Sequence, residues 1–203
     1  VFSWVALGPA VSNALAPVLA GLLIDQAGFR SGFAFAALLP ALAWAVAQRV
    51  PRHVPRQPSS AQAARRSAWS LLHSAPLRGL LMVNLSLSSC WDAHSFVVPV
   101  LGHARALSAS AIGLVLGSFA AAATLVRLGI TRWAERLHER TALRGAMALA
   151  TLTCAAYALL PGSLGMVFGS ALLGLALGSV QPMILSLLHH VTPPDRHGEA
   201  LGL

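Results

Sequence analysis

Charged residues are scarce in this sequence, and lysine is absent from it. Only 10% of its 203 residues are charged and 56% are apolar, whereas about a quarter of the residues in a soluble domain carry a charge. All 14 basic residues are arginines, and we interpret the missing lysine as a compositional bias and not as a site. This composition excludes an ordinary soluble domain, and with it a soluble nucleic-acid-binding module, despite the net charge of +8. It is typical of a polytopic helical membrane protein.

Cysteine is also rare, and no part of the sequence resembles a metal site. Cys90 and Cys154 both fall within apolar stretches, where a small apolar thiol is the default interpretation and a disulfide has little support. The segment from His189 to His197 is rich in histidine, but it holds no cysteine, and Asp195 is its one acid. Its prolines interrupt any helical spacing of ligands. We therefore expect neither a metal nor a cofactor.

Long apolar runs predict six transmembrane helices, because about 20 apolar residues cross a hydrocarbon core of about 30 Å. The run from Gly145 to Leu188 has no charged residue. One helix of that length would reach about 66 Å, so the run must be two helices that turn at Pro161-Gly162-Ser163. The expected spans are residues 1–24, 31–48, 79–101 and 109–126, and two within 145–188. The chain begins inside one apolar run and ends as another begins, which indicates a fragment.

The stretch from Arg127 to Arg144 sets the direction of these spans. It holds five arginines and two glutamates, and such an excess of arginine in a short connection predicts a cytoplasmic location. The same threading puts the basic, proline-rich connector of residues 49–78 in the cytoplasm. The turns at residues 25–30 and 102–107 then lie outside. The two long basic segments fall on one side of the membrane, which supports the count of six spans.

Asp92 is the most costly residue to place within a span. It lies about 21 Å beyond Arg78 in a core of about 30 Å, where a carboxylate costs roughly 2.5 to 3.5 kcal/mol. At 100° per residue, Asn84, Ser88, Asp92 and Ser95 fall within an arc of about 80° and form one polar stripe. We expect this stripe to face a watery cavity, where Asp92 binds substrate or takes up a proton. The alternative is a hydrogen bond to a neighbouring helix or a position near the outer water.

Two further residues are candidates for substrate or proton coupling. His94 lies about 200° around the helix from Asp92, so a direct pair is not expected unless the helix is broken. A structural hydrogen bond is favoured over a titrating role for His94. Gln181, which precedes Pro182, could line the pathway or serve packing. Gly113, Gly117 and Ala121 form a small-residue stripe that favours close helix packing.

Four local patterns, in order along the chain, resemble motifs of the major facilitator superfamily of secondary transporters. The first span is similar to the glycine-rich motif of the family's proton-coupled exporters, whose positions hold Ser3, Ser12, Ala16, Pro17, Ala20 and Gly21 here. Pro17 and Gly21 are identical to the motif and the others are small, so close packing and a bend are retained. Residues 25–30 resemble the family's outer loop after span five. Residues 194–202 resemble the start of span eleven.

The charged stretch resembles the family motif Gly-x-x-x-Asp-Arg-x-Gly-Arg-Arg, with both glycines lost and Asp replaced by Glu. Its positions here are Thr131, Glu135, Arg136, His138, Glu139 and Arg140, and Arg127 stands four residues before the first of them. The resemblance implies a cytoplasmic gate of Arg127, Glu135, Arg136 and Arg140, in which a charge lock between helix ends breaks on opening. For Arg127 the simpler alternative is a snorkelling anchor at the end of a span.

The resemblance implies an all-α membrane protein with a partial major-facilitator-like bundle of about six transmembrane helices. These would be spans five to ten, and the start of span eleven, of a twelve-span member. Residues 1–50 would form the last two spans of the N-terminal bundle, and residues 51–78 a basic cytoplasmic connector. Residues 79–203 would form the first four spans of the C-terminal bundle and the start of a fifth.

The expected function is secondary active transport by alternating access, with proton-coupled export of a small organic solute as the first interpretation. Uptake of an organic acid or sugar is the alternative. A polytopic membrane enzyme that uses the histidines and aspartates is a remote alternative, because these residues are scattered over both surfaces. The expected partners are a small-molecule substrate, protons, the lipid bilayer and the missing spans of the same transporter. The expected location is the cell membrane, in bacteria the inner membrane.

Overall fold

Six α-helices make up the computed structural model of this chain, which describes residues 2–49, 73–133, 139–157, 159, 162–192 and 196. The helices are α1 (Phe2–Ala27), α2 (Phe29–Ala47), α3 (Ala75–Ala104), α4 (Ala109–Trp133), α5 (Glu139–Tyr157) and α6 (Gly162–Val191). No strand occurs among the described residues. The predicted all-α fold and its six helices are therefore confirmed. Most of the predicted connector lies outside the described ranges, and so does the predicted start of span eleven apart from residue 196.

The helices extend further than predicted where the chain is charged. α4 continues to Trp133, although the prediction ended it at Val126, and α5 begins at Glu139 and not near Gly145. Arginine and glutamate are good helix formers, so helix continues into both sides of the predicted loop. The predicted division of residues 145–188 into two helices is confirmed, although two residues of the predicted turn, Gly162 and Ser163, already belong to α6. α6 begins at Gly162, whose φ of +63° lies in the left-handed region that glycine adopts without a Cβ clash.

Four helices are long and apolar enough to cross a membrane: α1 over Gly8–Ala27, α2 over Phe29–Ala47, α4 over Ala109–Ile130 and α6 over Gly162–Leu188. α3 and α5 have 30 and 19 residues, and both carry more polar residues. In α3 these include the stripe around Asp92, and in α5 they include Arg140 and Arg144. Since α3 and α5 both pack against α6, some of their surface is covered by protein. The chain is a multi-pass membrane protein.

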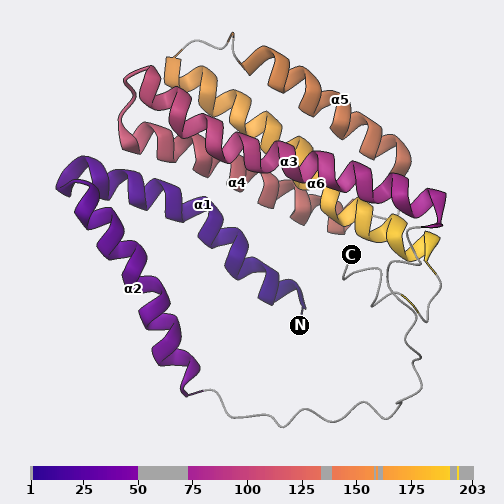
Figure 1. The fold of residues 1–203 in the computed structure, drawn as a ribbon, viewed down its shortest axis with the longest axis horizontal. Helices are drawn as coiled ribbons and strands as arrows, with labels where there is room; N and C mark the ends of the chain where they lie inside the picture. Colours follow the sequence, from indigo (N-terminus) through magenta and orange to yellow (C-terminus); the bar gives the residue numbers. More distant parts are fainter. Residues whose placement is uncertain are drawn as a thin grey trace.

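α4 is the central helix of the arrangement, with α1 on one side and α6 on another (Figure 1). Its contact with α6 depends on glycine. A Cβ on Gly174 would collide with the backbone of Phe119, and a Cβ on Gly178 with Ala123. These two residues let the helix backbones approach closely, as small residues do in membrane proteins. α2 contacts α1 and projects away from the other helices (Figure 1).

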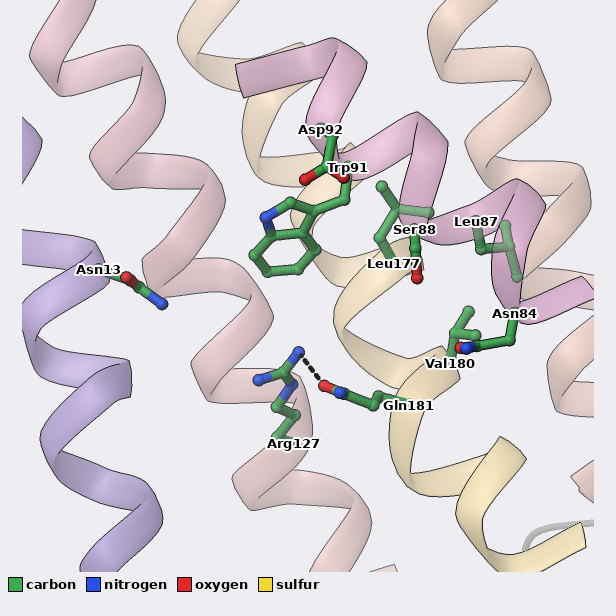
Figure 2. Close-up of a pocket in the computed structure, with 10 residues that line it drawn as sticks. All are labelled: Asn13, Asn84, Leu87, Ser88, Trp91, Asp92, Arg127, Leu177, Val180 and Gln181. Atoms are coloured by element: carbon green, nitrogen blue, oxygen red, sulfur yellow. Dashed lines mark hydrogen bonds between the residues drawn. The ribbon is translucent and has the colours of Figure 1, made fainter. Parts of the chain in front are cut away.

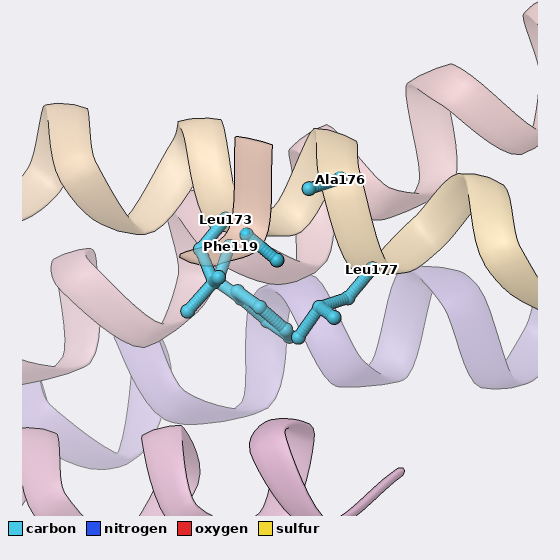
Figure 3. Packing of buried hydrophobic residues seen from close by; sticks show 5 residues of the cluster. Phe119, Leu173, Ala176 and Leu177 are labelled. Atoms are coloured by element: carbon cyan, nitrogen blue, oxygen red, sulfur yellow. The ribbon is translucent and has the colours of Figure 1, made fainter. Parts of the chain in front are cut away.

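The buried core lies between α4, α5 and α6. Its central cluster contains Phe119, Ala150, Leu173, Ala176 and Leu177 (Figure 3), and Leu87, Cys90 and Trp91 of α3 pack against it. The cluster fixes the position of α3 relative to α4 and α6. α2, in contrast, has no buried residue, and its side chains are almost all apolar. The apolar surface that α2 leaves exposed fits a span that faces lipid.

Candidate functional site

A polar cavity of about 280 Å³ lies between α1, α3, α4 and α6 (Figure 2). α1 contributes one lining residue and α4 another, whereas α3 and α6 contribute several each. Polar side chains dominate on α3, and one side chain of each charge is present. The lining residues are Asn13, Asn84, Leu87, Ser88, Trp91, Asp92, Arg127, Leu177, Val180 and Gln181.

The predicted polar stripe of α3 faces this cavity over most of its length. Asn84, Ser88 and Asp92 all line it, as their spacing of four residues along a helix predicts. Ser95 does not line it, and its hydroxyl donates to the Trp91 carbonyl of the same helix at 3.1 Å. Figure 2 marks one hydrogen bond among the ten lining residues, between Arg127 and Gln181. Asp92 forms no hydrogen bond with the other nine. The carboxylate is thus open to a ligand or proton in the cavity.

Arg127 is held inside the cavity by α6. Its Nε donates to the Gly178 carbonyl at 3.2 Å, and its Nη2 donates to Oε1 of Gln181 at 3.0 Å. The guanidinium carbon lies 5.6 Å from the centre of the Trp91 ring, within the range of a cation–π contact. Sequence reasoning placed Arg127 at a gate or an anchor and missed this pairing. The arginine and its partners lie on different helices, so no spacing along the chain could reveal it.

Proline explains why the Gly178 carbonyl is available to Arg127. In a helix this carbonyl would accept from the N–H of residue 182, but Pro182 has no N–H. The unpaired carbonyl is instead satisfied by a cation from the neighbouring helix. Pro17 in α1 similarly removes the helix partner of the Asn13 carbonyl, at the cavity-lining residue of that helix. Each of these two prolines therefore removes one helix hydrogen bond beside the cavity.

His94 lies on the other face of α3, away from the cavity and in the core. Its side chain is 7% exposed and stacks on Phe119 with ring centres 4.5 Å apart. Its Nε2 is 3.0 Å from the Ser170 hydroxyl, which donates to the Val115 carbonyl at 2.7 Å. Since that hydroxyl has one proton to donate, Nε2 must carry the hydrogen and donate it to Ser170. This is the structural hydrogen bond favoured above, and no Asp92–His94 pair forms.

The predicted gate is described only in part. Glu135 and Arg136 lie outside the described residues, Arg140 is exposed at the start of α5, and Arg127 bonds to α6 as above. The charge lock therefore remains a prediction. The small residues of the predicted packing motif can be placed more fully. Ser12 is exposed and Ala16 partly buried.

Two members of that packing motif lie against α4. A Cβ on Gly21 would collide with the backbone of Ala109, and a Cβ on Gly113 would collide with the Pro17 carbonyl. Gly117 approaches the Val18 side chain and the Ala14 carbonyl in the same way. The small-residue stripe predicted on α4 thus meets the packing motif of α1. This contact lies on one side of the cavity.

Helices of membrane-spanning length beside an internal polar cavity define a class of protein, the multi-span helical membrane proteins. A sequence model of the Major Facilitator Superfamily matches residues 1–203, the whole chain. The chain therefore belongs to this superfamily, which is a family of secondary transporters, and its fold is a partial bundle of that type. No match was found among curated proteins or among solved structures.

Proposed function

We propose that this chain is part of a secondary active transporter that exports a small organic solute in exchange for protons by alternating access. The observation that carries the proposal is the cavity in which the Asp92 carboxylate is exposed. A carboxylate within a span is costly, and an ionisable group that lines a cavity in a membrane protein is typical of a substrate or proton site. The proposed setting is the cell membrane, in bacteria the inner membrane.

The cavity residues take complementary roles in this proposal. Asp92 exchanges a proton or binds a cationic group of the solute. The amide and hydroxyl groups of Asn84, Ser88 and Gln181 form hydrogen bonds with the solute. The position of the cavity supports alternating access, since it lies between α1, from the expected N-terminal bundle, and helices of the expected C-terminal bundle. Spans outside this sequence would complete the cavity.

The proposed cytoplasmic gate combines Arg127 with Glu135, Arg136 and Arg140. Arg127 is anchored to Gly178 and Gln181, so it can transmit a change at the gate to α6. His94 is the second proposed coupling group, although it is buried among Phe119, Tyr157 and Ser170. Its contribution would be indirect, because its contacts hold α3 in position.

The test is transport by the full-length protein with Asp92→Asn in proteoliposomes. A panel of organic cations, organic acids and sugars is offered with and without an imposed pH gradient. We expect the substitution to abolish accumulation driven by the pH gradient. Solute exchange at equal pH on both sides should be unaffected, because asparagine keeps the shape of aspartate but not its titrating proton. Ser95→Ala is the matched control, since its hydroxyl bonds only within α3. Unchanged gradient-driven transport in Asp92→Asn would refute the coupling role.

Arg127 favours a second candidate function, the uptake of an organic acid. Its guanidinium lines the cavity and has one terminal nitrogen that is not used by Gly178 or Gln181. A fixed cation of this kind suits a carboxylate. The same panel, offered to intact cells that express the full-length protein, separates the two functions. Export depletes an organic cation from the cells, whereas uptake accumulates an organic acid, and an uncoupler abolishes either one.

A further inference from the structure

The carboxylate of Asp25, near the end of α1, caps the first turn of α4. Its Oδ1 accepts the Ala109 N–H at 2.9 Å, and its Oδ2 accepts the Ser110 N–H at 2.8 Å. The first N–H groups of a helix have no partner within the helix, and together they carry a partial positive charge. A carboxylate that binds two of them makes a charge-assisted contact. The contact joins residues more than 80 positions apart in the chain.

Next to this contact, α1 and α4 approach each other backbone to backbone. One turn before Asp25, Gly21 lies against the backbone of Ala109. One turn before Gly21, the Pro17 carbonyl lies against Gly113. Without side chains between the helices, the short aspartate side chain can reach the helix end. Toward the other end of α1, the cavity separates the same two helices, with Asn13 on one side and Arg127 on the other (Figure 2). α1 and α4 are thus in close contact at one end of the cavity.

We propose that Asp25 is the positioning residue that latches α1 to α4 at this end of the cavity, and that the latch opens in each transport cycle. The inference rests on the proposed alternating access, in which α1 and α4 belong to different bundles. The latched end is the one where α1 ends and α4 begins, opposite the basic connectors and therefore on the proposed outer side. When Asp25 is released, the state that is open to the outside becomes accessible.

The surroundings of Asp25 suit a contact that must break repeatedly. The side chain is exposed, so water can replace both hydrogen bonds when the helices separate, and no charge is left buried. A buried ion pair would leave an uncompensated charge on opening. The latch is therefore weak enough to open during turnover. It is also specific, because each carboxylate oxygen has its own backbone donor.

The test measures access to the interface that the latch closes. The full-length protein carries Val18→Cys, whose side chain position packs on Gly117, with Cys90 and Cys154 replaced by alanine. A membrane-impermeant maleimide is added from the outside. We expect Asp25→Asn to speed labelling of residue 18 about tenfold, since the amide nitrogen cannot accept an N–H, so one of the two bonds is lost, and the loss of charge weakens the other bond and the helix-dipole contact. Gln26→Ala, at the neighbouring exposed position, is the matched control and leaves the rate unchanged.

A second variant tests the other side of the same contact. Ala109→Pro removes the N–H that Oδ1 accepts, at the first position of α4 where proline is tolerated, and leaves Asp25 in place. We expect it to speed labelling as well, with little further increase when it is combined with Asp25→Asn. An unchanged labelling rate in both single variants overturns the latch, and so does an increase in Gln26→Ala that equals that in Asp25→Asn.

Failure of the proposed function is read from a separate measurement. Solute flux is followed in the unsubstituted full-length protein with the panel described above. If labelling of residue 18 responds to Asp25→Asn while the unsubstituted protein moves no solute, the latch stands and the transport proposal falls. If solute is transported but labelling does not respond, transport stands and the latch is wrong.

Discussion

At the scale of single residues, proline and glycine decide which polar groups reach the cavity. Pro182 leaves the Gly178 carbonyl without its helix partner, and Arg127 takes that place at 3.2 Å. Gly178 itself lets α6 approach Ala123, one turn before Arg127 on α4. The arginine therefore does not extend along its own helix toward the membrane surface, as a snorkelling side chain would. It lies across the helix interface and presents its charge to the cavity.

The hydrogen bond between His94 and Ser170 should contribute to the stability of the fold. Ser170→Ala removes the acceptor of the buried Nε2–H of His94 and should lower the free energy of unfolding by about 1 to 2 kcal/mol, the cost of an unsatisfied buried donor. Thermal unfolding of the full-length protein in mild detergent measures the change. Ser95→Ala is the control, because its exposed hydroxyl bonds within its own helix and should cost about 0.5 kcal/mol or less. Equal losses in the two variants would contradict the pairing.

At the scale of helices, the rotation of α3 about its axis determines whether Asp92 faces the cavity. Cys90 of α3 lies against α5, with its Sγ 3.7 Å from the Sγ of Cys154. Asp92 is two residues further, about 200° around the helix, and so points away from α5. A test of the contact between Cys90 and Cys154 is therefore also a test of whether Asp92 faces the cavity.

We expect mild oxidation with copper phenanthroline to join Cys90 and Cys154 within one chain, because the two thiols are already in contact and a disulfide requires only a small further approach. Loss of both thiols to alkylation and a decrease in mass of about two hydrogen atoms report the bond. Cys154→Ser is the control in which the bond cannot form. If both native thiols remain free to alkylation after oxidation, the rotation of α3 differs from the one described, and the lining role of Asp92 is in doubt.

Helix count, helix type and the polar face of α3 could be predicted from the sequence, because each is a property of one stretch of chain. The apolar runs predicted six helices, and the spacing of Asn84, Ser88 and Asp92 predicted a common face. The pairing of Arg127 with Gln181 and the capping of α4 by Asp25 could not be predicted. Each depends on how one helix is shifted and rotated against another, which is set by the packing of small residues such as Gly21 and Gly178. The charged ends of α4 and α5 were predicted as loop because charge signals a membrane surface and says nothing about where a helix stops.

At the scale of the whole molecule, helices of the two expected bundles line one cavity. The proposed role of each end of that cavity depends on which side of the membrane it faces. If the basic connectors are cytoplasmic, the contact between Asp25 and α4 closes the outer end of the cavity. If they are outside, the same contact closes the inner end, and the proposed direction of transport reverses. The orientation of the chain is therefore the property on which the proposed mechanism depends most.

Reporter tags at three positions of the full-length protein test this orientation. We expect tags at residues 60 and 138 to be cytoplasmic, since arginine-rich connections are retained inside, and a tag at residue 105 to be outside. Paired alkaline phosphatase and fluorescent protein fusions report the two sides, and an untagged protein that retains transport sets the baseline for correct insertion. Phosphatase activity at residue 138 together with fluorescence at residue 105 would show that the orientation in the membrane is opposite to the expected one. The latch would then act at the cytoplasmic end, and the gate formed around Arg127 would belong to the outer one.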